Sequence, residues 1–359
     1  MVPLVLGTNG NFYGTTSYGG ISAAHLDCSA GCGTVFEVTP TGQLTTLHTF
    51  CAKTNCADGD QPQAGLALGN DGNFYGTTQL GGSMGDGTVF KVTPTGTLTT
   101  LHSFCTQTSG NGNCLDGGEP TAGLVQGADG NFYGATLTYG VNSAGTIFKI
   151  SPSGTLTTLY SFCSQKSAGG FCLDGQNPSG GLVQGTDGNF YGITNYGGAN
   201  AHYECCGTVF QITPAGTLTT LHSFCSDMSG ETCADGQLPY AGLTQATNGN
   251  FYGGTTYGGT PSNLCGKGGC GVVFSLSMGL TPFVEAVPAF GSTGRTIGIL
   301  GNDLTGTTSV TFNGISATFT VLSGTVITAK VPAGATTGAI EVTTPSGTLQ
   351  SNVSFHVLP

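Results

Sequence analysis

The hexapeptide DGNFYG stands at residues 71–76, 129–134 and 187–192, and NGNFYG stands at residues 9–14 and 248–253. Each copy opens with Asp-Gly or Asn-Gly, a pair that favours a two-residue hairpin turn because both central positions prefer positive φ. The aromatic residues that follow are typical of a β-strand. Five copies of one hairpin signal predict an array of similar β-units.

Three other segments recur in the same order around each hexapeptide. Successive NFYG copies are 58 to 62 residues apart, which is the period of a supersecondary repeat. The recurring segments are a GTVF-type run at 33–36, 87–90, 145–148, 207–210 and 271–274, an LTTLHSF-type run at 44–50, 98–104, 156–162 and 218–224, and an AGL-type run at 64–68, 122–126, 180–184 and 241–245.

Each unit is predicted to form four antiparallel strands, in the order AGL-type run (strand A), NFYG (B), GTVF (C) and LTTLHSF (D). A four-stranded sheet repeated around an axis is a propeller blade, so residues 1–280 are predicted to form a five-bladed β-propeller. A linear β-solenoid is the alternative, although its coils usually need fewer residues. The fifth copy lacks LTTLHSF, and residues 279–284 are expected to replace it as an outer strand.

The tail, residues 281–359, differs from the repeats because it contains no cysteine. Short alternating strands such as SVTFNG and ATFTVLS are separated by Gly and Asn turns. This pattern predicts a second domain with an immunoglobulin-like β-sandwich. The whole chain is therefore expected to be all-β.

Composition excludes several classes of partner. The chain has 64 glycines in 359 residues and only 7% charged residues, with a formal net charge of −11. So few Lys and Arg residues exclude a basic patch for nucleic acid or anionic membrane. No apolar stretch is long enough to span a bilayer, and the first residues lack the features of a signal peptide. We expect no membrane insertion.

The 14 cysteines each have a near neighbour in sequence. An even number of locally paired cysteines favours disulfides formed in an oxidising compartment. Zinc is the competing interpretation, but no CxxC is present, and no second Cys pair or His pair is expected to complete a site within each repeat. The expected pairs are Cys28/Cys32, Cys51/Cys56, Cys105/Cys114, Cys163/Cys172, Cys225/Cys233 and Cys265/Cys270. The adjacent Cys205 and Cys206 are left as either a vicinal disulfide or two free thiols.

Taken together, NFYGTT, GTVFKVTP, LTTLHSFC and the CADG or CLDG tracts resemble GloVer-type tandem repeats over about residues 1–275. The tail resembles an IPT/TIG immunoglobulin-like domain through ILGNDL, VTFNG, VPAGATTG and IEVTTPSG. The resemblance implies a secreted or surface-anchored bacterial protein. It carries over no catalytic residue and no cofactor.

All seven cysteine pairs fall in B–C loops or D–A connections, which share one face of the repeat array. We call this face the stapled loop face. Its B–C loops vary most between copies, and variable loops on a rigid scaffold are where binding usually occurs. Candidate contacts are tyrosines that precede a Gly-Gly pair and an insertion that breaks the repeat: Tyr18, Tyr196 and Tyr257, with His202, Tyr203 and Glu204. Packing against the next blade is the alternative for the tyrosines.

A recurring aspartate also lies in each D–A connection, always before glycine: Asp58, Asp116, Asp174 and Asp235. The identical setting predicts a turn or cap rather than one ligand site per blade. For an enzyme, paired carboxylates outside the repeat pattern would be needed. The candidates on the stapled loop face have no spacing that pairs them: Asp60, Asp86, Glu119, Glu204, Asp227 and Glu231.

Three functions remain. The sequence favours a non-catalytic extracellular module that binds a polysaccharide or a cell-surface protein. The first alternative is a carbohydrate-active enzyme, a glycoside hydrolase or lyase, with its site at the propeller mouth. The second is a structural protein that self-assembles through exposed blade edges.

Overall fold

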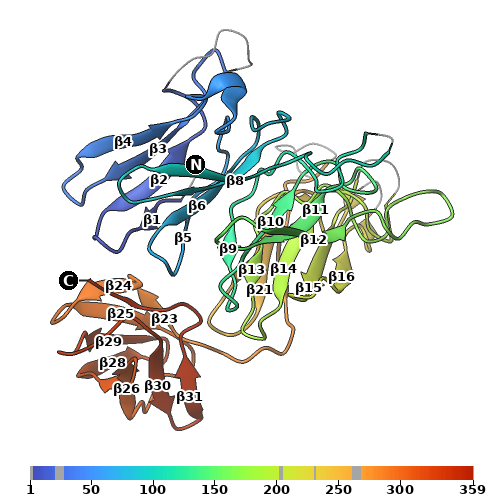
Figure 1. Ribbon diagram of the computed structural model, residues 1–359. Coiled ribbons are helices and arrows are strands. Elements are labelled where there is room, and N and C mark those ends of the chain that lie inside the picture. Colours follow the sequence, from blue (N-terminus) through green and yellow to red (C-terminus); the bar gives the residue numbers. More distant parts are fainter. Residues whose placement is uncertain are drawn as a thin grey trace. The chain divides into compact units, whose positions relative to one another are not determined.

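The computed structural model describes residues 3–20, 28–110, 112–201, 205–229, 232–260 and 268–358. Within these residues the fold is all-β apart from one short 3₁₀ turn, η1 (Thr54–Cys56) (Figure 1). The chain divides into two compact units. The first comprises residues 1–7, 11–244 and 253–274, and the second comprises residues 8–10, 245–252 and 275–359.

Four sheets of the first unit share one four-stranded antiparallel order, as predicted from the first four repeats. Each sheet follows the sequence order A, B, C, D. The strands are β1 (Val5–Leu6), β2 (Phe12–Thr16), β3 (Thr34–Val38) and β4 (Leu44–Thr49); β5 (Ala67–Leu68), β6 (Phe74–Thr78), β7 (Thr88–Val92) and β8 (Leu98–Ser103); β9 (Val125–Gln126), β10 (Phe132–Thr136), β11 (Thr146–Ile150) and β12 (Leu156–Ser161); and β13 (Val183–Gln184), β14 (Phe190–Thr194), β15 (Thr208–Ile212) and β16 (Leu218–Ser223).

The DGNFYG hexapeptide forms a turn that its own side chains close. In the second sheet, Asp71 accepts hydrogen bonds from the backbone N–H and the side-chain amide of Asn73, at 3.2 and 2.8 Å. The Tyr75 hydroxyl donates to the same carboxylate at 2.9 Å. The third and fourth sheets repeat the tyrosine contact at 2.8 and 2.9 Å. The hexapeptide is therefore a structural unit, as the sequence indicated.

The tyrosine and phenylalanine of NFYG join one sheet to the next. Both rings are fully or almost fully buried in the second, third and fourth sheets. In the first three repeats the tyrosine ring stacks on the phenylalanine of the following repeat, with centroid distances of 4.0, 3.9 and 3.9 Å: Tyr13 on Phe74, Tyr75 on Phe132, and Tyr133 on Phe190. One recurring aromatic pair thus builds three successive interfaces.

The last glycine of the hexapeptide makes room for a second aromatic contact. A Cβ atom on Gly76 would lie 2.6 Å from the ring of Phe90, so a larger residue cannot occupy this position without a shift. Phe90 packs edge-on against Phe50 of the first sheet, with centroids 5.2 Å apart. The same edge-on contact recurs along the array: Phe104 with Phe148, Phe162 with Phe210, and Phe224 with Phe274.

The fifth sheet differs from the other four. It contains β19 (Gln237–Pro239), β20 (Thr244–Gln245), β21 (Phe251–Tyr257) and β22 (Val273–Leu276), and β21 pairs with all three other strands. The small hairpin β17 (Met228–Ser229) and β18 (Thr232–Cys233) precedes it.

The prediction of an outer strand at residues 279–284 is wrong. No strand forms there, and Phe283 and Val284 are buried instead. Val284 belongs to the core of the second unit, and the Phe283 N–H donates to the Thr247 carbonyl at 3.0 Å. These apolar residues bury more completely in that core than they would on a sheet edge.

The second unit contains two four-stranded sheets that share one core. The first has the order β23 (Glu285–Val287), β25 (Thr296–Leu300), β29 (Val326–Lys330) and β28 (Phe319–Ser323). The other has the order β27 (Ile315–Ser316), β26 (Ser309–Phe312), β30 (Ile340–Thr344) and β31 (Gly347–Gln350). Strands β24 (Phe290–Ser292) and β32 (His356–Leu358) pair in parallel. Alternate residues such as Ile297, Ile299, Val310 and Phe312 fill the core.

Candidate functional site

Disulfides hold the loops of the stapled loop face. The structure joins the cysteines of each D–A connection locally: Cys51–Cys56, Cys105–Cys114, Cys163–Cys172 and Cys225–Cys233. In the B–C loops it joins Cys28–Cys32 and the adjacent Cys205–Cys206. Cys270 is also disulfide-bonded, whereas Cys265 lies outside the described residues.

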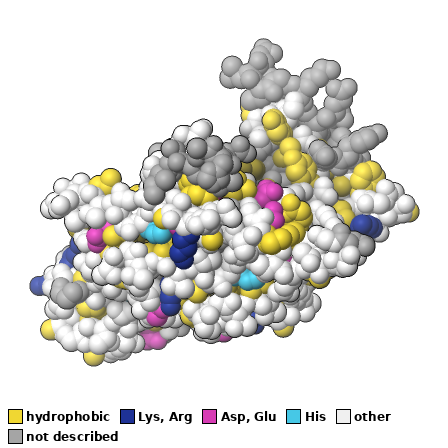
Figure 2. All heavy atoms as spheres, turned by 45° about the horizontal axis from the view of Figure 1, so that its top comes forward, with side chains coloured by type: hydrophobic (Ala, Val, Ile, Leu, Met, Phe, Trp, Pro, Cys, Tyr) yellow, Lys and Arg dark blue, Asp and Glu magenta, His cyan; other side chains and the backbone are white. Residues whose placement is uncertain are grey.

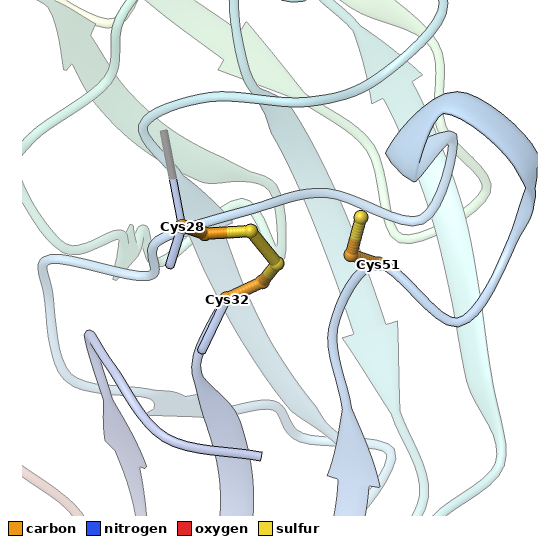
Figure 3. Close-up of side chains that lie close together, drawn as sticks. All are labelled: Cys28, Cys32 and Cys51. Atoms are coloured by element: carbon orange, nitrogen blue, oxygen red, sulfur yellow. A yellow bond between two sulfur atoms is a disulfide. The ribbon is translucent and has the colours of Figure 1, made fainter. Parts of the chain in front are cut away.

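Two B–C disulfides lie beside D–A disulfides, which the sequence analysis did not recognise. The sulfur atoms of Cys28, Cys32 and Cys51 all lie within 4.8 Å of one another (Figure 3). Cys205, Cys206 and Cys225 are equally close in the fourth sheet. In these two repeats a second cysteine pair therefore does lie beside the first, contrary to the expectation that no second pair completes a site. The CGTVF tract at 32–36 and 206–210 was the available signal.

The recurring aspartates anchor the D–A connections to the last strand of each sheet. Asp58 is fully buried and accepts hydrogen bonds from the backbone N–H groups of Ala52 and Lys53 at 3.2 and 3.1 Å. His48 Nε2 of β4 lies 3.0 Å from its Oδ2. Burial alone would raise the pKa of Asp58, but the hydrogen bonds from His48, Lys53 and Ala52 outweigh it and lower the pKa. Asp58 therefore acts as a cap.

The other sheets repeat this anchor with different partners. His102 lies 2.9 Å from Asp116, and His222 lies 3.1 Å from Asp235. In the third sheet the Tyr160 hydroxyl donates to Asp174 at 2.7 Å, and burial together with this contact raises the pKa of Tyr160 to about 12. Because the carboxylates face the backbone and their own strand, they are unsuited to binding one ligand per blade.

The three candidate tyrosines are not equivalent in the structure. Tyr18 is 56% exposed and Tyr257 is 46% exposed, so both rings are available to a ligand. Tyr196 is half-buried, and its backbone pairs with Gln176 in the preceding D–A connection. Tyr139 of the third repeat is also half-buried. His202, Tyr203 and Glu204 lie outside the described residues.

The structure joins the backbones of two of the candidate acidic residues. The Glu119 N–H donates to the Asp86 carbonyl at 2.8 Å, and the Asp86 side chain hydrogen-bonds to Tyr139. Burial raises the pKa of Asp86, against the Tyr139 hydrogen bond, and the negative charge of Asp116 adds to the increase. No sequence spacing linked these residues, because they come from successive repeats.

This backbone contact is a feature of the repeat rather than of a special site. Equivalent N–H groups donate to the residue before the GTVF-type run in three other repeats, at 2.8 to 2.9 Å: Gln61 to Cys32, Asn177 to Ala144, and Leu238 to Cys206. The side chains at these positions differ between repeats, but the backbone hydrogen bond is the same. Of the other carboxylates, Asp60 is buried and Asp227 is exposed, and Glu204 and Glu231 lie outside the described residues.

A shallow pocket of about 320 Å³ lies beside the segments that precede β1, β5 and β9. Its lining contains no ionisable side chain, and consists of Pro3, the segment 63–66, Gly123 and Leu124. It therefore offers no acid or base for hydrolysis. Among the described residues, no helix is long and apolar enough to cross a membrane.

A sequence profile of the Gloeobacter/Verrucomicrobia repeat matches residues 2–172 and residues 111–327. Together these overlapping regions span most of the chain. The chain belongs to this family. The two matched regions cover the four-stranded sheets described above, and the second region extends into the second unit.

Solved structures show only distant likeness to this repeat protein. An α-L-arabinofuranosidase from Clostridium thermocellum is 13% identical, with a TM-score of 0.36, over 78% of this chain and 90% of that one. An exo-β-1,3-galactanase from Phanerochaete chrysosporium is 11% identical, with a TM-score of 0.39, over 99% of this chain and 89% of that one. No curated protein matches the sequence.

Proposed function

We propose that this repeat protein is a secreted, non-catalytic module that binds neutral polysaccharide through the stapled loop face. The observation that carries the proposal is the exposure of Tyr18 and Tyr257, while the NFYG tyrosines of the first four repeats are buried. A tyrosine ring presents an apolar face with a polar edge, which suits stacking on a sugar ring.

The low content of charged residues and the disulfide-constrained loops support the proposal of a neutral ligand. Acidic and basic side chains are few and scattered over the face shown in Figure 2. With 7% charged residues in the chain, aromatic stacking and neutral hydrogen bonds are the main forces available. Disulfides beside the loops limit the entropy that binding removes, because the loops are already constrained. They also fit an extracellular location.

Two finer structural assignments belong to this proposal. The five sheets would close into a five-bladed propeller, and the second unit, with its two sheets over one core, would be the IPT/TIG immunoglobulin-like domain. Such a domain would space the binding face from a cell surface. The boundary near residue 280 follows from this assignment.

We expect Tyr18→Ala and Tyr257→Ala to weaken binding to a neutral polysaccharide by about tenfold each, because each removes a stacking platform. A glycan array with soluble and insoluble polysaccharides identifies the ligand, and isothermal titration measures the change. Tyr252→Ala is the matched control, because Tyr252 is 38% exposed and lies in β21, outside the B–C and D–A loops.

Binding that is unchanged in both variants would contradict the proposal, as would a large loss in the Tyr252 control. The melting temperature should stay within 1–2 °C of wild type, roughly the effect expected for a surface substitution. The same array is assayed for cleaved products. Cleaved products would show that the protein is a carbohydrate-active enzyme rather than a non-catalytic binding module.

A second candidate function, self-assembly, is favoured by the end faces of the sheet array. In the first sheet Leu4 is 49% exposed, whereas its equivalent Leu66 in the second sheet is 8% exposed against the first. Val273 of the fifth sheet is 83% exposed, whereas its equivalent Val89 is fully buried against the third sheet. The first sheet therefore exposes the surface that later sheets pack against the preceding sheet, and the fifth sheet exposes the surface that earlier sheets pack against the following sheet.

Complementary halves on opposite ends suit a head-to-tail contact between copies of this chain. We expect wild-type protein to associate with rising concentration, and Val273→Glu to keep it monomeric, as measured by sedimentation velocity. Leu322→Glu is the control, because Leu322 is 62% exposed in the second unit. A wild-type monomer that Val273→Glu destabilises would instead indicate a ring closed within one chain.

A further inference from the structure

We propose that the paired disulfides of the first and fourth sheets are redox-gated sites for a thiophilic divalent cation, of which Zn²⁺ is the type. The first site consists of Cys28, Cys32, Cys51 and Cys56. The second consists of Cys205, Cys206, Cys225 and Cys233. In the oxidised chain each set forms two disulfides, and in the reduced chain its four thiolates would bind one cation.

Three of the four sulfurs of the first site already lie close to the spacing of a tetrathiolate. Sulfur lies about 2.3 Å from zinc, so the sulfurs of a tetrahedral Cys₄ site lie about 3.8 Å apart. The sulfurs of Cys28, Cys32 and Cys51 are all within 4.8 Å of one another, and Cys56 is bonded to Cys51. Figure 3 shows the Cys28–Cys32 bridge and Cys51 at the ends of neighbouring strands. Once the Cys51–Cys56 bond is reduced, the Cys56 side chain would rotate toward the other three sulfurs to complete the site.

Backbone hydrogen bonds hold these cysteines independently of the sulfur–sulfur bonds. The Cys32 carbonyl accepts from Gln61 at 2.9 Å, and the Cys51 N–H donates to Gly59 at 3.1 Å. The Cys56 carbonyl accepts from Gly59 and Gly82 at 2.8 and 2.9 Å. Reduction of the disulfides therefore leaves the loop backbone in place, so that the ligands stay preorganised.

The fourth sheet reproduces this support although its cysteine spacing is different. The Cys206 carbonyl accepts from Leu238 at 2.8 Å, and the Cys233 carbonyl accepts from Gly236 and Gly259 at 3.1 and 2.9 Å. The Cys225 N–H donates to Gly236 at 3.3 Å. In both sites three of the four cysteines are almost fully buried, which excludes water that would compete for the cation: Cys28, Cys32 and Cys56, and Cys206, Cys225 and Cys233.

The chemistry balances with a dithiol as the reductant. Each disulfide accepts two electrons and two protons from one dithiol, which leaves as its own disulfide, so a site consumes two dithiols. The four thiols then lose four protons as their thiolate sulfurs bind the cation. One bound cation then cross-links the same loops that the two disulfides linked in the oxidised chain.

The second and third sheets are natural comparators. Each keeps its D–A disulfide, but the position of Cys32 is held by Asp86 in the second sheet and by Ala144 in the third. The third sheet therefore offers only the two sulfurs of Cys163 and Cys172 at the corresponding place. In the second sheet a carboxylate oxygen of Asp86 and the sulfurs of Cys105 and Cys114 lie within 4.8 Å of one another, so this sheet offers two sulfurs and a carboxylate. Binding by four thiolates should therefore be confined to the first and fourth sheets.

Titration of the full chain with Co²⁺, after anaerobic reduction with a dithiol and removal of the reductant, tests the proposal. We expect two Co²⁺ per reduced chain with the visible spectrum of tetrahedral thiolate coordination, displaced by Zn²⁺, and none for the oxidised chain. Cys32→Ser and Cys206→Ser should each abolish one site. Loss of a group that only orients a ligand lowers metal affinity by about 10–100-fold, and loss of a ligand itself should lower the Co²⁺ affinity of that site by more. Cys163→Ser should leave both sites intact.

Equal titrations for the reduced wild type and the Cys32→Ser/Cys206→Ser double variant would overturn the proposal. Loss of both sites in Cys163→Ser would do the same. Circular dichroism is recorded in parallel. If the reduced chain unfolds, two equivalents of Zn²⁺ should restore the wild-type β-sheet signal, and failure to restore it also overturns the proposal.

Discussion

Phe132→Ala is expected to lower the free energy of unfolding of the repeat array by about 3–5 kcal/mol, the usual cost of removing a buried phenylalanine. Phe132 is fully buried and stacks on Tyr75 with a centroid distance of 3.9 Å. Its ring lies in the cluster that joins the second and third sheets. Removal of the Phe132 ring leaves a cavity between these two sheets, because side chains fill the interface there.

Chemical denaturation followed by circular dichroism measures the loss. Because each sheet packs mainly on its neighbours, the variant is also expected to unfold in two steps, as a broken repeat array does. Phe171→Ala is the matched control, since Phe171 is 37% exposed in a D–A connection. It should change the stability by less than about 0.5 kcal/mol. Similar losses for the two variants would show that the stacked interface does not carry the stability of the array.

Asp58→Ala is expected to lower the free energy of unfolding by about 3 kcal/mol at pH 7, because buried groups left without a partner each cost about 1–3 kcal/mol. The variant removes the acceptor of the Ala52 and Lys53 N–H groups and of the His48 ring. Asp227→Ala is the control, since Asp227 is an exposed residue of another D–A connection.

The effect of Asp58 should depend on pH in a defined direction. Its pKa is lowered in the folded state, so its contribution is complete above the unfolded carboxyl pKa of about 3.9 and is lost as the pH falls through the folded value. The difference between wild type and Asp58→Ala should therefore be constant near neutral pH and shrink in acid. A difference that grows in acid would contradict the assignment of Asp58 as an ionised cap.

The repeat unit was predictable because its information is local. Asp71, Asn73 and Tyr75 lie within five residues, and together they form the turn, the strand and the ring that contacts the next sheet. The period of the hexapeptide then implies equivalent sheets. The same locality explains why the cysteine partners within each D–A connection could be expected from proximity alone.

The cysteine clusters of the first and fourth sheets and the Asp86–Glu119 contact were not predictable in the same way. Cys32 and Cys51 are separated by two strands and a turn, and they meet because β3 and β4 pair antiparallel, with Thr34 opposite Thr49. Asp86 and Glu119 belong to successive repeats, and they meet only after one sheet has packed beside the next. Their proximity depends on register and packing, which no spacing encodes.

The sequence by itself determined the all-β class, the repeat, the order of strands in four sheets and the structural role of the hexapeptide. Each follows from hairpin turns and side-chain alternation, which act over a few residues. Tertiary structure decided the rest: residues 279–284 contribute to another core, Tyr18 and Tyr257 are exposed while Tyr196 is half-buried, and two disulfides lie together in each of two sheets. Burial depends on which surfaces meet, and that is settled only when the sheets pack.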